Sequence, residues 1–173
     1  QPKSRSPMTP LAALLLDWVL TALWPLIAAA GMRHDSGLLF SAAGLSHSRL
    51  LVGWNGIYDE RQRAEIDAYL NLANTLHIDV LVTFGNSRAN GRDRPSPSQL
   101  SAVLRIFRQR YPWVTEFAPW NAPNLQGSAP ELTARYWRAL RRECPRCTIL
   151  AADMVDTANM KRWIKRFRKV SRK

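Results

Sequence analysis

The sequence predicts an α/β fold built from parallel βα units, and two observations support this. Continuous apolar runs, typical of strands buried on both faces, are centred near Leu51, Leu81, Phe117 and Leu150. A stretch with helical spacing of apolar residues follows each run. Strands that alternate with helices at a nearly constant interval indicate a parallel sheet with right-handed crossovers. Such units form either an open doubly wound sheet or part of a barrel.

The expected elements can be placed from local signals. We expect a first helix after an Asp59 cap and a second after a Ser98 cap, because both residue types favour helix N-termini. Residues 26–32 read as a possible earlier strand and 38–43 as a short helix. Counting that strand gives about five units. The predicted strands are 49–54, 79–84, 114–119 and 148–152, and the later helices are 130–142 and 157–170.

Composition allows one folded domain and several kinds of partner. The chain has 173 residues and 46% hydrophobic residues, with seven Trp. It is short for a complete (β/α)8 barrel, which needs roughly 250 residues. The net charge is +12, from 25 Lys and Arg against 13 Asp and Glu. That excess suits nucleic acid, an acidic polymer or an anionic membrane, or simply solvated helix faces.

The two cysteines, Cys144 and Cys147, do not form a metal site by themselves. Zinc normally takes four ligands, and no histidine has suitable spacing to this pair. A thioredoxin-type motif opens a helix, whereas this one closes a helix. A local disulfide or two free thiols therefore remain. We expect no metal and no cofactor, since no phosphate-binding glycine motif is present either.

The N-terminal stretch is read as a targeting segment. Lys3 and Arg5 precede an apolar run at 11–27 and three alanines at 28–30, which is the order of a secretory signal peptide. The run is also about long enough to span a bilayer. A buried helix followed by a first strand at 26–32 is the alternative. We expect residues 1–30 to be a signal peptide or membrane anchor, and the protein to be secreted or anchored outside the cell.

The polar turn after the third predicted strand is the main candidate site. Trp120, Asn121 and Asn124 follow the apolar run directly. Ligands of βα units bind at the carboxyl ends of the strands. An indole beside carboxamides suits a sugar, since it offers an apolar face together with hydrogen-bond donors and acceptors.

The segment Trp120-Asn121-Ala122-Pro123-Asn124 resembles the Trp-Asn-Glu-Pro-Asn motif of the large retaining clan of (β/α)8 glycoside hydrolases. The likeness is to cellulase-like members of actinobacterial type. It implies that residues 31–173 form a partial TIM barrel of about five units. In the family, the motif glutamate ends strand four and is the general acid/base. The corresponding residue here is Ala122.

Other strand ends extend the resemblance. The strand that carries Arg49 is similar to the Arg-bearing second strand of the clan, and Trp54 ends it, where a sugar platform would lie. Phe84-Gly85-Asn86-Ser87-Arg88 is similar to a Phe-Gly-His-Ser-Arg stretch of actinobacterial members, so Asn86 and Arg88 are candidate contacts to hydroxyls. The resemblance implies that Asn121 contacts the sugar 2-hydroxyl.

The resemblance implies a carbohydrate ligand without efficient catalysis. The family's nucleophile lies on strand seven, beyond the predicted strands, and Asp153 and Asp156 after the last strand are more often helix caps. A partner chain would complete the barrel. The alternative is an anion-binding module for nucleic acid or membrane. Residues 161–173 hold eight basic and no acidic residues, including Lys161, Arg162, Lys165 and Arg166.

Overall fold

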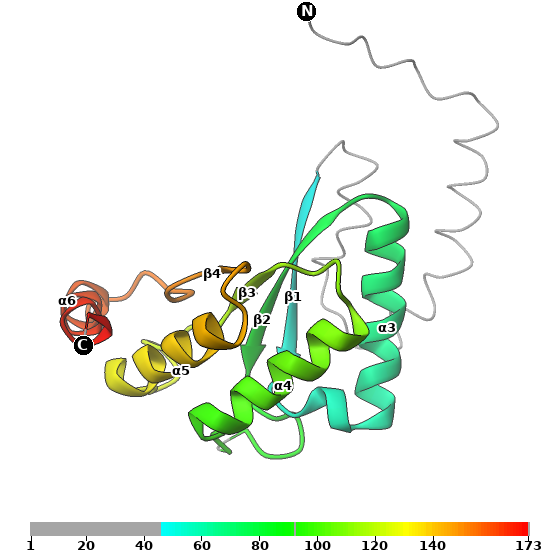
Figure 1. Cartoon of the computed structure of the whole chain (residues 1–173). Helices are drawn as coiled ribbons and strands as arrows, with labels where there is room; N and C mark the ends of the chain where they lie inside the picture. The colour runs from blue at the N-terminus through cyan, green and yellow to red at the C-terminus, as the bar shows by residue number, and fades with distance from the viewer. Residues whose placement is uncertain (1–45, 92, 173) are drawn as a thin grey trace, which may run out of the picture.

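A computed structural model describes residues 46–91 and 93–172, which form a parallel sheet with helices (Figure 1). Four strands lie in chain order, β1-β2-β3-β4: β1 (His47–Gly53), β2 (Asp79–Gly85), β3 (Glu116–Ala118) and β4 (Thr148–Ile149). The helices are α3 (Glu60–Thr75), α4 (Pro97–Arg110), α5 (Pro130–Glu143) and α6 (Met160–Ser171), with a 3-10 turn η1 (Gly56–Tyr58). The predicted class of parallel βα units is confirmed.

The predictions for residues 1–45 lie outside the described residues. They include the signal or anchor at 1–30, the strand at 26–32 and the helix at 38–43. The structure therefore describes four βα units, where the sequence predicts about five. Within 46–91 and 93–172, no helix is both long and apolar enough to cross a bilayer.

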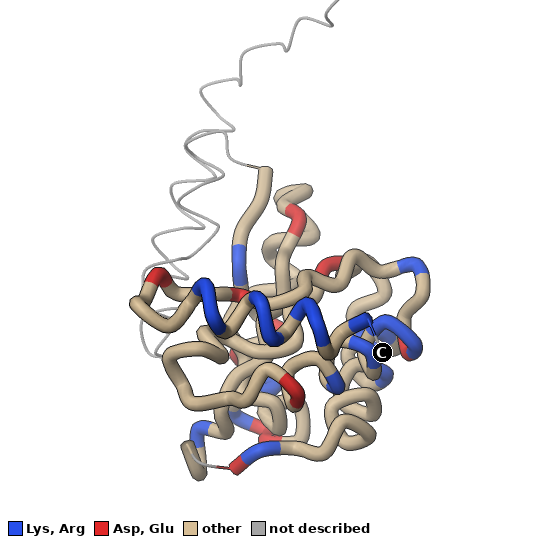
Figure 2. The backbone as a smooth tube through the Cα atoms, turned by 90° about the vertical axis from the view of Figure 1, so that its left-hand side faces the viewer, with Lys and Arg blue, Asp and Glu red and all other residues tan. Residues whose placement is uncertain are grey.

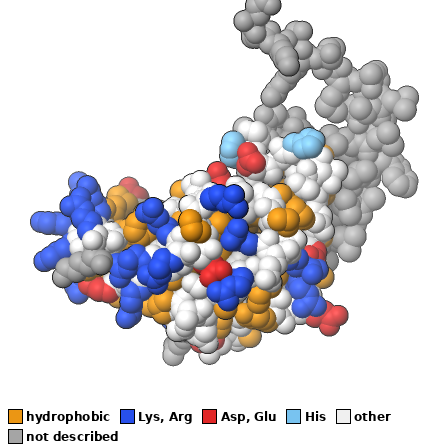
Figure 3. Space-filling model, viewed as in Figure 1, with side chains coloured by type: hydrophobic (Ala, Val, Ile, Leu, Met, Phe, Trp, Pro, Cys, Tyr) orange, Lys and Arg blue, Asp and Glu red, His pale blue; other side chains and the backbone are white. Residues whose placement is uncertain are grey.

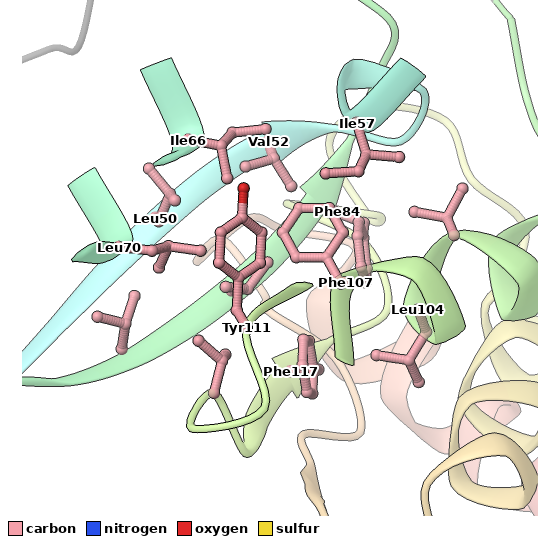
Figure 4. Close-up of a cluster of buried hydrophobic side chains, with 14 of the residues drawn as sticks. Leu50, Val52, Ile57, Ile66, Leu70, Phe84, Leu104, Phe107, Tyr111 and Phe117 are labelled. Carbon is pink, nitrogen blue, oxygen red and sulfur yellow. The ribbon is translucent and has the colours of Figure 1, made fainter. Parts of the chain in front are cut away.

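One face of the sheet packs on the helices and forms the main core (Figure 4). Alternation along β1 and β2 turns Leu50, Val52, Val82 and Phe84 toward α3 and α4, and Phe117 of β3 joins them. The Phe84 ring meets Phe107 of α4 edge-on, at 5.6 Å between centroids. Each such side chain stabilises the fold by roughly 1.5–3 kcal/mol through burial. The remaining buried members shown include Ile57, Ile66, Leu70, Leu104 and Tyr111.

Local capping sets where the first two helices begin. Asp59 caps α3 as predicted, because its side chain accepts a hydrogen bond from the Gln62 amide at 2.8 Å. The cap of α4 is Ser96, so the prediction of Ser98 was wrong. Ser96 and Gln99 form a reciprocal capping box. Pro97 is well suited to the first helical position, which places the cap one residue before it.

The last two strands are shorter than predicted. The ladder between β3 and β4 continues only to the bond from the Leu150 amide to the Phe117 carbonyl, at 2.8 Å. Pro119 then follows in the chain of β3 and has no N–H to donate. A single later bridge joins Asn121 to Asp153. The predicted strands at 114–119 and 148–152 therefore persist only as short segments.

The second sheet face, which carries Arg49 and Leu51, is concave. All described crossovers place their helices on the other face, as strands in consecutive order require. Arg49 on β1 donates to Asp153, just beyond β4, at 2.6 Å. In a flat sheet the first and fourth strands lie about 14 Å apart, farther than one arginine side chain reaches. The sheet is therefore curved around this face, as in a barrel wall.

The helix α6 is held by a separate, smaller cluster on α5. Trp163 and Phe167 stack at 5.4 Å and pack with Ala134. The Trp163 indole donates to the Ser128 carbonyl at 3.0 Å. The Lys and Arg residues that recur along α6 are exposed (Figure 2). The apolar stripe of the predicted helix at 157–170 is thus confirmed, although the helix begins at Met160.

The Cys144–Cys147 pair is a disulfide immediately after α5. Of the two possibilities predicted from the sequence, the local disulfide is the one present. The loop it closes joins the end of α5 to the start of β4.

Candidate functional site

Three polar side chains meet over the concave face, and we call Arg49, Asn121 and Asp153 the edge cluster. Arg49 is the third residue of β1, whereas Asn121 and Asp153 follow the carboxyl ends of β3 and β4. The Arg49 guanidinium donates to Asp153 Oδ2 at 2.6 Å and to Asn121 Oδ1 at 3.3 Å. The residues come from three different βα units. The Arg49 side chain is 41% exposed and that of Asp153 is 23% exposed. The cluster is therefore ordered and still reachable from solvent.

The backbone of Asn121 is fixed by the neighbouring strand. Its amide donates to the Phe84 carbonyl at 2.7 Å, and its bridge to Asp153 aligns the two chains. Gly85 lies beside it. A Cβ on Gly85 would stand 3.8 Å from the Asn121 Cβ and 3.2 Å from Leu51 Cδ1. Glycine at this position lets the edge cluster sit close to the floor of the concave face.

Ala122 has an uncommon backbone conformation for a residue other than glycine. Its φ is +42°, in the left-handed region. Its carbonyl accepts from the amides of Leu125 and Gln126 at 3.0 and 2.9 Å, so a tight turn follows. The side chain is a buried methyl group, with 6% exposure. The methyl group at this position, which the motif resemblance aligned with a glutamate, cannot transfer a proton.

Trp120 does not present its ring to solvent, contrary to its predicted role. The side chain is completely buried. It packs on Tyr136 at 5.4 Å between centroids, and the Arg94 guanidinium lies 5.0 Å from the indole centroid. Burial of a large aromatic ring in the core leaves no face for a sugar to stack on. Trp120 is a core residue in this structure.

Asn124 is also used within the fold. Its amide nitrogen donates to the Val155 carbonyl and to Thr157 Oγ1, both at 2.8 Å. Its amide oxygen accepts from the Val155 backbone at 3.1 Å. These bonds tie the turn after β3 to the loop before α6. The predicted role of Asn124 in sugar contact is replaced by a structural one.

The other predicted contacts are distributed around the same edge without converging. Asn86 Oδ1 accepts from Arg94 at 2.8 Å, and Arg88 forms an ion pair with Glu65 of α3. Trp54 is partly buried against the main core, and its indole N–H has no hydrogen-bond partner among the described residues. Of the predicted site residues, the structure brings together Arg49 and Asn121.

Three residues that matter at this edge were not predicted as contacts. Asp153 completes the edge cluster, although a helix cap was the preferred reading for it. Arg94 joins the loops of two units, because it bonds Asn86 and also the Gln126 carbonyl at 2.6 Å. Tyr58, in η1 after β1, exposes 55% of its surface. A tyrosine just beyond a strand end was the one sequence signal that could have indicated it.

The clearest pKa shifts lie on the helix side of the sheet. The Arg110 guanidinium, hydrogen-bonded to Asp67, holds the pKa of that carboxyl below its usual value. Burial raises the pKa of Tyr111, which donates to the same carboxylate at 2.8 Å. Burial likewise raises the pKa of Tyr136 to about 12. These groups join packed helices and loops, so their shifts reflect structural contacts rather than a reactive centre.

No metal site is indicated in the part of the chain that the structure describes. No group of three or more His, Cys, Asp or Glu side chains is placed there to hold an ion.

The chain matches no protein-family model, and no curated protein matches it. The function must therefore be argued from the residues at the sheet edge and on the surface.

Proposed function

We propose that this protein is a glycoside hydrolase-like carbohydrate-binding protein without efficient hydrolytic activity. The observation that carries the proposal is the edge cluster, in which Arg49 of β1 reaches Asn121 and Asp153 just beyond the carboxyl ends of β3 and β4. Ligand sites of βα folds form at that edge. The short motif shared with the retaining glycoside hydrolases supports carbohydrate as the ligand class.

The chemistry of the edge cluster suits vicinal hydroxyl groups. A guanidinium offers several donors in a fixed plane, a carboxylate accepts, and a carboxamide does both. A sugar hydroxyl both donates and accepts, so it can bond two of these groups together. Tyr58, in η1 beyond the carboxyl end of β1, supplies an exposed aromatic ring. It takes the role of stacking platform in this proposal, in place of the buried Trp120.

The same residues argue against turnover. Retaining hydrolysis needs two carboxyl groups roughly 5 Å apart, one of them protonated to act as the acid. Ala122 has no carboxyl group in its side chain. In the edge cluster the one carboxylate is Asp153, and it is paired with Arg49. General acid/base catalysis contributes roughly 10²- to 10⁴-fold, so its loss leaves little activity.

A glycan array followed by titration of the bound sugars tests the binding proposal. We expect Asn121→Ala and Asp153→Asn each to weaken binding at least tenfold. Asn71→Ala, an exposed change on α3, is the matched control and should leave binding unchanged. Sugar binding through neutral hydroxyls should change little between low and high salt. Binding to no glycan, or equal binding by all four proteins, would contradict the proposal.

A glycosidase assay tests the absence of turnover. The unaltered chain should show no hydrolysis of aryl glycosides above background. Ala122→Glu restores one carboxyl group only, and we expect it to remain far below an efficient enzyme. Rapid hydrolysis by the unaltered chain would show that the catalytic residues lie elsewhere.

We also propose that the protein is exported. The order of basic, apolar and small residues at positions 1–30 supports this, as does the Cys144–Cys147 disulfide, because disulfides persist mainly in oxidising compartments. Alkylation of the protein taken directly from its source is the test. Both thiols should be blocked, and mass analysis should place the first residue near Gly31 or find the chain in membrane. Reactive thiols on a soluble cytoplasmic protein would contradict export.

A second copy of the chain is our proposal for the partner that completes the barrel. Among the described strands, β1 and β4 each pair on one side only. Leu51 and Leu150 are 46% and 39% exposed on the concave side. Two such walls that meet at their open edges would close a barrel. Light scattering should give a dimer mass that Leu51→Lys reduces to a monomer, whereas a monomeric unaltered chain would refute the pairing.

A further inference from the structure

Lys and Arg side chains gather at the end of the molecule that carries α6 (Figure 3). Lys161, Lys165, Arg168, Lys169 and Arg172 border a single shallow, open groove together with Ile164. We call these five basic residues the α6 ridge. All are exposed. At 3.6 residues per turn they fall within an arc of about 100° on the helix surface.

The opposite side of α6 is already occupied by the protein. Trp163 and Phe167 pack on α5 and expose only 8% and 6% of their surface. Arg138 of α5 donates to the Val170 carbonyl at 2.6 Å. The orientation of α6 is thus fixed by packing, and the ridge is held outward.

An acidic residue neutralises positive charge on one flank of α6, whereas the α6 ridge has no such counter-charge among the described residues. On the flank beside α5, Glu131 forms an ion pair with Arg166. No residue of the ridge has an ion-pair partner anywhere in 46–91 or 93–172. Self-repulsion among these exposed like charges is relieved when a polyanion binds.

We propose that the α6 ridge binds the phosphate backbones of double-stranded DNA, without reading the sequence. The helix has 12 residues and is therefore about 18 Å long. Duplex DNA carries one charge for roughly every 1.7 Å of axis. Its major groove, about 12 Å wide, admits a single helix. The ridge residues lie on the exposed side of α6, where they can contact the phosphates that flank such a groove.

The shape and composition of α6 favour DNA over a membrane. Helices that lie in a membrane interface bury an apolar face among the lipids. The apolar face of α6 is buried against α5 instead, and none of the large exposed hydrophobic residues of the described chain lies on α6. A flat anionic surface would also touch only the crest of a convex helix.

Fluorescence anisotropy with a labelled 20-base-pair DNA duplex of mixed sequence tests the inference on the full chain. Five phosphate contacts predict a slope of about −4.5 in log K against log salt, so affinity should fall about 500-fold between 50 and 200 mM salt. The triple variant Lys165→Gln/Arg168→Gln/Lys169→Gln should lose about three contacts and fall only about tenfold over that range. A second duplex of unrelated sequence should bind equally.

The matched control removes the same charge elsewhere. Arg61→Gln/Arg142→Gln/Arg146→Gln alters exposed arginines outside α6 and should keep the salt slope of the unaltered chain within one unit. Lys165→Arg/Lys169→Arg keeps the charge and should keep the affinity. Equal losses in the two triple variants would show an effect of net charge alone. Absence of DNA binding at 50 mM salt, or stronger binding to vesicles of phosphatidylglycerol than to DNA, would overturn the proposal.

Discussion

Basic side chains are arranged differently in the two halves of the molecule. Around α3 and α4, three arginines each reach a carboxylate at 2.5–2.8 Å: Arg88 to Glu65, Arg105 to Glu143, and Arg110 to Asp67. On α6, the ridge residues have no such partners among the described residues. The same residue types therefore hold helices together in one half and remain available to bind a polyanion in the other. Net charge alone does not distinguish these two uses.

Asp67→Ala gives the largest expected effect, because it breaks the most connected of the paired contacts. Asp67 accepts from Arg110 and also from the Tyr111 hydroxyl, and Tyr111 is only 1% exposed. A buried hydroxyl left unpaired costs about 1–3 kcal/mol of the free energy of unfolding. Urea unfolding measures this. Asp156→Ala, an exposed carboxylate in the loop before α6, should change stability by less than about 0.5 kcal/mol. Equal losses of unfolding free energy in Asp67→Ala and Asp156→Ala would show that the paired carboxylate is no more important for stability than an unpaired one.

Acid should weaken the paired half through the same carboxyl. The Arg110 hydrogen bond lowers the pKa of Asp67 from its ordinary 3.8, so the unfolded chain takes up the proton more readily. The stabilisation is complete above pH 3.8 and is lost as the pH falls through the lower folded pKa. Unfolding free energies measured from pH 6 to pH 2 should fall more steeply for the unaltered chain than for Asp67→Asn. Parallel curves would contradict this.

The substitution Glu131→Gln tests how a carboxylate beside α6 affects DNA binding by the α6 ridge. Arg166 holds the pKa of Glu131 below its usual value, so this carboxylate stays charged beside α6 at neutral pH. Its removal should raise DNA affinity about twofold at low salt, since one nearby repulsion is lost. Anisotropy titration measures the change. A weaker affinity would mean that Glu131 positions α6 for binding rather than opposing it.

Lys165→Gln should have the smallest effect on stability. Its side chain is exposed and has no ion-pair partner in the described part of the chain, so the free energy of unfolding should stay within about 0.5 kcal/mol. Thermal melting is sufficient to check it. A loss as large as that of Asp67→Ala would show that the ridge is structural.

The fold was largely predictable because its signals are repeated. Apolar runs located all four described strands, and helical spacing located the helices. Two of the boundaries that failed depend on prolines. Pro97 moved the cap of α4 back to Ser96, and Pro119 ended the β3 ladder early. The periodicity of apolar residues does not show where a strand lacks a backbone N–H to donate to its neighbour.

The candidate site was only partly predictable. Asn121 was found because it follows a strand end, and Arg49 because its strand is similar to the Arg-bearing strand of the glycoside hydrolases. Trp120 was misassigned because an aromatic residue after a strand has the same sequence signature in a core and in a sugar platform. Asp153 and Arg94 both belong to loops. Asp153 pairs with Arg49, which is 104 residues away in the chain, and Arg94 pairs with Asn86, which is 8 residues away. Such separations leave no local pattern.

The contact between Arg49 and Asp153 has a consequence for the order of folding. It joins residues 104 positions apart and exists only once the four strands have curved together. Contacts between distant positions carry the largest loop-closure cost, so this one should form after the rate-limiting step. Its removal should then accelerate unfolding and leave the refolding rate nearly unchanged. The lifetime of the native state, more than the speed of reaching it, would then respond to the loss of this contact.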